Sequence, residues 1–210
     1  MLFVCTGNVC RSPMAERLLV WMLGGGHGRT IERSNTGSVL MQRDLTSGHA
    51  GAAIDAGGRD VVVESAGVAA LAGQGMDAAS AEAIRDLGAD ADGHVARQLT
   101  DEMLDRAHLV LVAETSHRRA VLGRRPGLMG RTFTMVEFAR LAASLDPAAM
   151  VDLDVDARVR LVAAQRGRVP APVVGGDDIA DPYRQSMDVA STCAAQIWMI
   201  LPSLVELLQA

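Results

Sequence analysis

The sequence feature that most constrains this chain is the segment VCTGNVCRS at residues 4–12, which lies between an apolar run and a helical pattern. Residues 2–4 are typical of a short buried strand. Ser12 is suited to cap a helix that has Pro13 at its first position and runs to about Leu23, before three glycines. The loop between strand and helix has backbone N–H groups without a regular partner, and the helix adds its positive end. The sequence therefore predicts a nest for an anion of phosphate size.

The side chains of this loop suit phosphate transfer. Cys5 lies at the strand end, where the field that attracts phosphate also favours the thiolate over the thiol. Arg11 offers a planar fork that matches two phosphoryl oxygens, and Ser12 can donate a hydrogen bond to the thiolate. Gly7 and Asn8 tolerate the left-handed backbone that a tight curl requires. One loop thus supplies nucleophile, cradle and charge clamp, and we expect neither a metal nor a cofactor.

The alternative interpretation of Cys5 is a buried structural cysteine at a strand end. The pattern C-x5-R alone is short and arises by chance. Its position between strand and helix, with Gly and Asn inside it, favours the catalytic interpretation.

The rest of the chain alternates strand-like and helix-like segments. Residues 60–65 and the apolar run 108–113 are typical of strands. This alternation predicts a mostly parallel sheet covered by helices. We interpret residues 1–210 as one domain with irregular insertions near 24–59 and 145–176. Helices are expected at residues 78–87, 100–107, 116–122, 135–143 and 185–208, the last one broken or bent at Pro202.

Composition limits the partners of such a site. The formal net charge of −5 at pH 7 gives no general attraction to nucleic acid, so an anion must be held by a local positive site. Three cysteines are too few for a disulfide framework and indicate a reducing compartment. The apolar run 197–205 is interrupted by Pro202 and is far shorter than the roughly 20 residues that span a bilayer. We expect a cytoplasmic protein that binds neither nucleic acid nor membrane.

Four stretches resemble one known family, in the same order. CTGNVCRSPMAE at residues 5–16 closely resembles the signature of the low-molecular-weight protein tyrosine phosphatases, and VESAG at 63–67, HVARQLT at 94–100 and DPY at 181–183 are similar to later blocks. The resemblance implies a doubly wound, four-stranded parallel sheet flanked by helices, with the phosphate-binding loop after the first strand. It also implies a phosphatase that hydrolyses phosphotyrosine or related phenolic phosphate esters through a phosphocysteine. Its substrate would be a phosphorylated protein or a small phosphate ester.

The resemblance assigns roles beyond the nucleophile. Asp181 would be the general acid that protonates the leaving phenolate, and then the base for the water that hydrolyses phosphocysteine. Tyr183 would form one wall of the pocket. The expected catalytic residues are thus Cys5, Arg11 and Asp181, and the expected substrate-binding residues are Thr6, Gly7, Asn8, Val9, Cys10, Ser12 and Tyr183.

Two further roles also come from the resemblance. Ser65 and His94 would hold the loop residue Asn8, although His94 after a glycine is also typical of an exposed loop histidine. Cys10 would form a reversible disulfide with Cys5, its alternative being a small residue of the loop wall.

The chain departs from the family at the pocket walls. Arg184 follows DPY where relatives of the eukaryotic type have a second aromatic, and residues 68–72 contain no aromatic. A slot for a flat ring is therefore less well walled, and the preference for phosphotyrosine is open.

Two other functions compete with the phosphatase. An arsenate reductase can share this loop, but the type coupled to thioredoxin needs two more cysteines, and none lies between residues 11 and 192. A version that uses a small external thiol needs only Cys5. In such a reductase Asp181 would have less of a role. A phosphoprotein-binding module without catalysis would normally have lost Cys5, Arg11 or Asp181.

Overall fold

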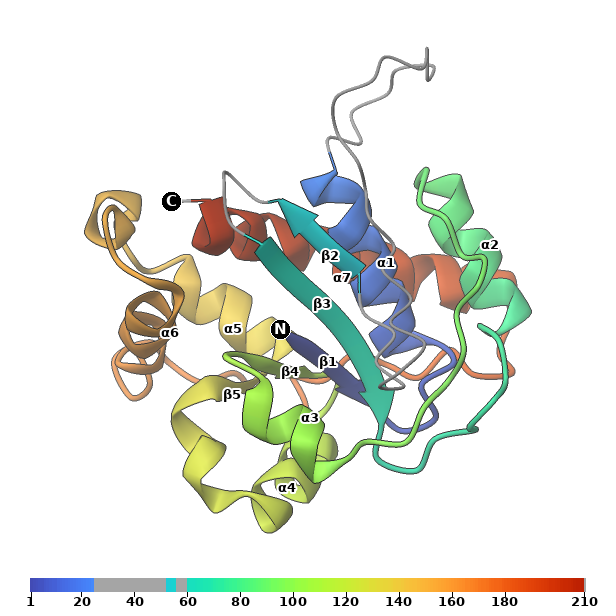
Figure 1. Ribbon diagram of the computed structural model, residues 1–210, viewed down its shortest axis with the longest axis horizontal. Coiled ribbons are helices and arrows are strands. Elements are labelled where there is room, and N and C mark those ends of the chain that lie inside the picture. Colours follow the sequence, from blue (N-terminus) through green and yellow to red (C-terminus); the bar gives the residue numbers. More distant parts are fainter. Residues whose placement is uncertain (25–51, 56–59, 210) are drawn as a thin grey trace.

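The core of the protein is a five-stranded sheet, which the computed structural model shows within the residues it describes, 1–24, 52–55 and 60–209 (Figure 1). The strand order is β2-β3-β1-β4-β5. The pairs β1–β3, β1–β4 and β4–β5 are parallel, which confirms the predicted four-stranded parallel sheet, and β2 adds an antiparallel edge strand against β3. The strands are β1 Leu2–Cys5, β2 Ala52–Asp55, β3 Asp60–Gly67, β4 Val110–Val112 and β5 Thr132–Thr134.

Both faces of the sheet are covered by helices, which is why β1 and β4 are apolar throughout. Alternate residues of β1 face opposite layers: Phe3 and Cys5 belong to one buried cluster, and Leu2 and Val4 to another. The first face packs against α1 Arg11–Leu23, α2 Ala78–Asp86, α5 Met135–Ala142, α6 Val155–Ala163 and α7 Met187–Gln209, and the second against α3 Asp101–Arg106 and α4 Thr115–Arg124.

Several helices and strands differ in position from those predicted from the sequence. Helix α1 begins at Arg11, so Cys10 is its N-cap and Ser12 is buried in the first turn instead of capping it. Strand β5 was not predicted, because its three residues are too short to show a pattern. The segment 145–176, expected to be irregular, contains α6 and the 3₁₀ helix η2 Pro147–Met150; a second 3₁₀ helix, η1, spans Pro126–Arg131.

The other expected insertion, 24–59, lies mostly outside the described residues, apart from residue 24 and strand β2. The interpretation of residues 1–210 as one domain with two insertions stays a prediction.

Helix α7 runs without interruption through Pro202, where a break or bend was expected. Among the described residues, it is the one helix with the length and apolarity to cross a membrane. One side of it, with Ala194, Ile197 and Leu201, is buried in the cluster shared with α1, α2 and α5, as in a core helix. It closes the layer that covers the first face of the sheet.

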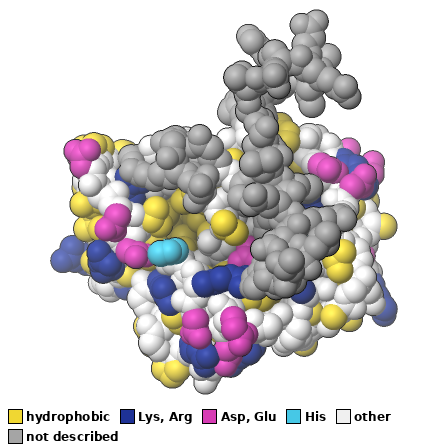
Figure 2. Space-filling view, in the orientation of Figure 1, with side chains coloured by type: hydrophobic (Ala, Val, Ile, Leu, Met, Phe, Trp, Pro, Cys, Tyr) yellow, Lys and Arg dark blue, Asp and Glu magenta, His cyan; other side chains and the backbone are white. Residues whose placement is uncertain are grey.

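Charged side chains of both signs are mixed on the face shown in Figure 2, including the surface over α3 and α4. Ion pairs account for part of this mixture, since Arg124 and Arg125 of the α4 end contact Asp101 and Asp105 of α3. Such exposed pairs contribute little stability individually.

The carboxyl ends of β1, β3 and β4 meet at one edge of the sheet. Strand β1 has β3 on one side and β4 on the other, so the loop after β1 leaves the sheet at the point where the strand order reverses. In open α/β sheets this position is the usual ligand-binding crevice.

Candidate active site

The loop at residues 6–10 is held from outside through its carbonyl oxygens. The carbonyls of Cys5, Thr6 and Gly7 accept hydrogen bonds of 2.9–3.0 Å from the backbone of residues 68–71. The Val9 carbonyl accepts from Asp77 N at 2.8 Å, and the Cys10 carbonyl from Met14 N at 2.9 Å. With these carbonyls engaged on the outside, the loop N–H groups are left for the enclosed centre, as in an anion nest.

The loop can lie this close to the end of β3 only because residue 67 is glycine. A Cβ atom at Gly67 would lie 2.4 Å from the carbonyl oxygen of Thr6. Of the two residues expected to take a left-handed backbone, Asn8 does so with φ of 56°, whereas Gly7 is not among the positive-φ residues. The curl therefore depends on Asn8 and on the close approach at Gly67.

The sulfur of Cys5 lies at the base of this loop and is surrounded by donors. Asn8 N donates to Cys5 Sγ over 3.3 Å, and Ser12 Oγ lies 2.9 Å from the same sulfur. Because Asn8 Nδ2 donates to Ser12 Oγ over 3.0 Å, the serine proton is available to the sulfur. Both contacts stabilise a thiolate, and Cys5 is only 3% exposed.

Asn8 is braced from three directions. Its Nδ2 donates to Ser65 Oγ over 2.9 Å, and its Oδ1 accepts from Arg97 N over 2.9 Å. His94 Nε2 lies 2.7 Å from the Asn8 carbonyl oxygen and donates to it. The structure thus brings together the predicted trio of Asn8, Ser65 and His94. The histidine contacts the backbone of Asn8 and comes from the loop before α3.

Burial shifts the pKa values of two groups behind this brace. It lowers the pKa of His94, which favours the neutral ring that donates through Nε2. It raises the pKa of Glu16, a carboxyl group of α1 that accepts the Ser65 hydroxyl proton in a hydrogen bond. A continuous hydrogen-bonded chain therefore connects Glu16 through Ser65, Asn8 and Ser12 to the Cys5 sulfur.

Arg11 projects from the start of α1 and is 1% exposed. Its Nη1 forms an ion pair with Glu114 and donates to the Ile179 carbonyl over 2.9 Å, and its Nη2 lies 3.1 Å from Asp181 Oδ2. Burial acts against ionisation of Glu114, but the Arg11 guanidinium holds the pKa of this carboxyl below its usual value. The guanidinium is thereby fixed in orientation by one residue after β4 and by the loop before α7.

The pocket above Cys5 has a volume of about 130 Å³. Arg11 and Asp181 line it together with Cys5, and Tyr183 is also part of its lining. Residues 68–72 supply small or aliphatic lining, Ala69 and Leu71, in place of an aromatic. The full lining consists of Cys5, Thr6, Gly7, Val9, Cys10, Arg11, Ala69, Leu71, Asp181 and Tyr183.

Cys10 lies in the same loop and lines the same pocket. Burial raises its pKa to about 12, so its thiol stays protonated at neutral pH. Cys5, Cys10 and Cys193 are all unbridged and buried, and Cys193 belongs to the core on α7.

Sequence reasoning missed four residues that surround the loop: Glu16, Arg97, Glu114 and His117. His117 Nε2 lies 2.8 Å from Thr6 Oγ1, and burial lowers the pKa of this histidine. One signal was available for Glu114 and His117, since they follow the apolar strand at 108–113 at the edge where ligands bind. Glu16 and Arg97 reach the loop through contacts with residues that are distant in sequence.

Comparison with known proteins finds relatives in one family. A family model described as "Low molecular weight phosphotyrosine protein phosphatase" matches residues 1–38 and 49–147. The chain is 31% identical over 192 residues to a low molecular weight protein-tyrosine-phosphatase of Streptomyces coelicolor, covering 90% of this chain and 87% of that protein. It is 30% identical over 147 residues to the low molecular weight protein-tyrosine-phosphatase Etp of Escherichia coli, covering 70% and 76%.

Comparison of the structure with solved structures finds proteins of the same kind. A crystal structure of the low molecular weight protein tyrosine phosphatase from T. tengcongensis superposes with a TM-score of 0.61 at 26% identity, over 98% of this chain and 96% of that one.

Proposed function

This chain belongs to the low molecular weight phosphotyrosine protein phosphatase family, and on that premise we propose that it hydrolyses phosphotyrosine in proteins through a phosphocysteine on Cys5. One observation carries the proposal: Asp181, which is far away in sequence, lines a single pocket of about 130 Å³ together with the loop residues Cys5 and Arg11. Nucleophile, clamp and proton donor then act on one bound phosphate. The assignments of individual residues below are part of this proposal.

In the first step, the Cys5 thiolate attacks phosphorus and the bond from phosphorus to the phenolic oxygen breaks. The loop N–H groups and the Arg11 guanidinium bind the non-bridging oxygens, whose charge they stabilise in the transition state. The neutral carboxylic acid of Asp181 gives its proton to the leaving phenolate, so a phenol departs. Asp181 is suited to this contact because it lies next to Arg11 and is 47% exposed at the pocket mouth.

In the second step, water attacks the phosphocysteine and the bond from phosphorus to sulfur breaks. The Asp181 carboxylate takes a proton from this water, which regenerates the acid and yields inorganic phosphate. Cys5 leaves as a thiolate, and Ser12 Oγ at 2.9 Å and Asn8 N at 3.3 Å stabilise the charge on its sulfur. The same contacts therefore serve attack and departure.

The pocket walls support a phenolic substrate. Tyr183 and Leu71 belong to the apolar cluster around Val9 and Cys10, so a ring entering the pocket meets apolar surface above the phosphate site. Arg184 lies over the Tyr183 ring, 5.0 Å from its centroid, and stabilises this wall through a cation–π contact. A flat ring has one aromatic wall and one aliphatic wall here.

The arsenate reductase alternative is not favoured, because the relatives are phosphatases. The test of the proposed function is turnover of four substrates by the same preparation: p-nitrophenyl phosphate, a phosphotyrosine peptide, a phosphoserine peptide of the same sequence, and arsenate with glutathione. The proposal expects the two aryl phosphates to be hydrolysed and the other two to be poor substrates. Faster turnover of arsenate than of either aryl phosphate would reject it.

Proteins of this family act on phosphorylated proteins or phosphate esters, and we propose a phosphorylated protein as the partner of this chain. We also propose that it acts in the cytoplasm, where its thiolate nucleophile is kept reduced.

A further inference from the structure

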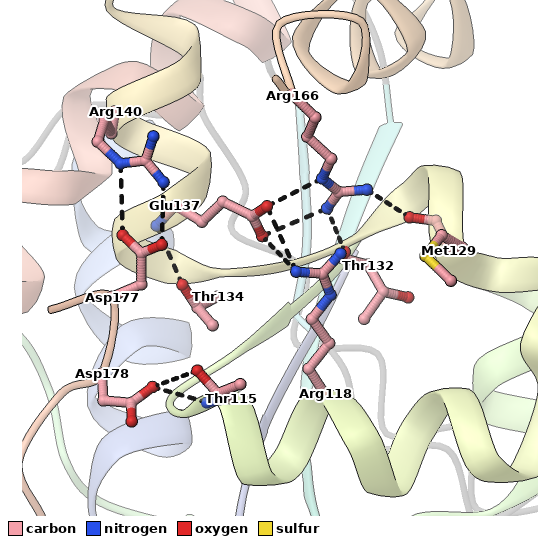
Figure 3. A network of polar contacts seen from close by, with 10 residues as sticks. All are labelled: Thr115, Arg118, Met129, Thr132, Thr134, Glu137, Arg140, Arg166, Asp177 and Asp178. Atoms are coloured by element: carbon pink, nitrogen blue, oxygen red, sulfur yellow. Dashed lines mark hydrogen bonds and ion pairs between the residues drawn. The ribbon is translucent and has the colours of Figure 1, made fainter. Parts of the chain in front are cut away.

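The segment that carries Asp181 is fixed at three successive residues upstream of the acid. Asp177 pairs with Arg140 of α5 at 2.9 Å, and Asp178 Oδ1 accepts hydrogen bonds from Thr115 N at 2.7 Å and Thr115 Oγ1 at 2.8 Å. The next residue, Ile179, donates its N–H to the Ala113 carbonyl at 2.9 Å. Figure 3 shows both aspartates directed away from each other, toward α5 and α4 respectively.

The carboxyl group of Asp181 itself has few contacts that could fix its position. Its Oδ2 lies 3.1 Å from Arg11 Nη2, and its Oδ1 accepts from Tyr183 N at 3.3 Å within its own turn. Its side chain is 47% exposed. The position of this carboxyl group therefore depends on the backbone that precedes it.

The two anchor points are themselves joined. Glu137 of α5 is buried and pairs with Arg118 of α4 at 3.2 Å and with Arg166 at 2.9 Å (Figure 3). Arg140 lies one turn after Glu137 on α5, and Thr115 lies one turn before Arg118 on α4. The spacing between the two anchors is thus set by a pair of cross-linked helices.

We propose that Asp178, held by Thr115, is a positioning residue for the general acid, and that Asp177 with Arg140 is its second anchor. This inference rests on the proposed role of Asp181. Neither Asp177 nor Asp178 lines the pocket, and both have partners on other elements. Displacement of a catalytic group by about 1 Å can cost on the order of 10²-fold in rate.

The test compares Asp178→Ala with Asp178→Asn. Both hydrogen bonds from Thr115 go to Oδ1 of Asp178, and an asparagine retains that acceptor oxygen while it cannot transfer a proton as an acid. Asp178→Ala should lower kcat for a phosphotyrosine peptide on the order of 10- to 100-fold, with little change in KM, and lower kcat for p-nitrophenyl phosphate far less. Asp178→Asn should restore most of the lost rate.

The double variant Asp178→Ala/Asp181→Asn should be no slower on the phosphotyrosine peptide than Asp181→Asn alone, because the acid to be positioned is gone. Asp154→Ala is the matched control, since it removes an aspartate whose side chain also accepts a backbone N–H near a helix start, that of α6. If Asp178→Ala is poorly folded by thermal unfolding, Thr115→Val removes one of the two hydrogen bonds, and Thr115→Ser should restore it. The same substrate-selective loss is then expected for Thr115→Val.

Equal losses on both substrates, or losses that add to those of Asp181→Asn, would overturn the inference. So would an Asp178→Asn variant as slow as Asp178→Ala. These results differ from a failure of the proposed function, in which Asp181→Asn itself would show no dependence on the leaving group.

Discussion

Arg11 Nη2 and Asp181 Oδ2 lie 3.1 Å apart, at the pocket that ends on the Cys5 sulfur. One side chain comes from the first turn of α1 and the other from the loop before α7. A phosphoryl group gripped by the guanidinium would therefore have its leaving oxygen near the carboxyl group. This contact makes the clamp and the acid parts of one unit in the proposed mechanism.

Arg11→Lys should lower kcat/KM for p-nitrophenyl phosphate on the order of 10²–10³-fold. Arg11 uses Nη1 for Glu114 and the Ile179 carbonyl and Nη2 for Asp181, and an ammonium group cannot hold these partners and two phosphoryl oxygens together. Steady-state kinetics measure the effect, with Arg125→Lys, in a surface pair with Asp105, as the control. A variant with nearly unchanged kcat/KM would mean that Arg11 is not the clamp.

Asp181→Asn should slow hydrolysis of a phosphotyrosine peptide on the order of 10²–10⁴-fold and slow p-nitrophenyl phosphate hydrolysis much less. A tyrosine phenolate, with a pKa of about 10, needs a proton to leave, whereas p-nitrophenolate leaves with little help. Parallel kcat measurements on the two substrates check this, with Asp154→Asn as the control. Equal, small losses would assign the proton transfer to another residue.

The sequence predicted the parts of the molecule whose signal is local. The phosphate loop is contiguous at residues 5–12, and β1 and β4 are uninterrupted apolar runs because helices cover both sheet faces. Strand β5 has only three residues, and α6 lies in a stretch without a clear apolar period, so neither showed a pattern.

The predicted site residues converge in the structure, but the groups that support them were not predictable one by one. Glu114 and His117 reach the loop from the end of β4, and Glu16 lies under Ser65. Their contacts join residues about 50 to 110 positions apart, which no local pattern encodes.

Mild peroxide should inactivate the enzyme reversibly through a disulfide between Cys5 and Cys10. Peroxide oxidises the Cys5 thiolate to a sulfenic acid, and the Cys10 thiol, which its raised pKa of about 12 keeps protonated at neutral pH, then condenses with it and releases water. Peptide mass mapping before and after dithiothreitol measures the bond. The Cys10→Ser variant should instead lose activity irreversibly. Cys5 recovered as sulfinic acid beside a free Cys10 in the parent protein would refute the prediction.

The free energy of unfolding should fall as the pH drops below about 6.5, in part because of His94 and His117. Burial lowers the pKa of both histidines in the folded state, so the unfolded chain binds more protons over this range. Their contribution is complete above the ordinary histidine value of 6.5 and is lost toward acid. His94→Gln retains a donor for the Asn8 carbonyl without titrating, and should reduce the slope. Urea unfolding at about pH 7.5 and about pH 5.5 measures it; an unchanged slope in the variant would contradict the assignment.

The most direct test of the account is the Cys5→Ser variant, assayed for turnover of p-nitrophenyl phosphate and for binding of vanadate. The nucleophile is separate from the backbone nest and Arg11, so turnover should be abolished while vanadate still binds. Cys193→Ser, which changes another buried cysteine on α7, should retain activity and shows that the loss is specific to the loop. Substantial hydrolysis by purified Cys5→Ser protein would contradict the central claim that phosphate is transferred to Cys5.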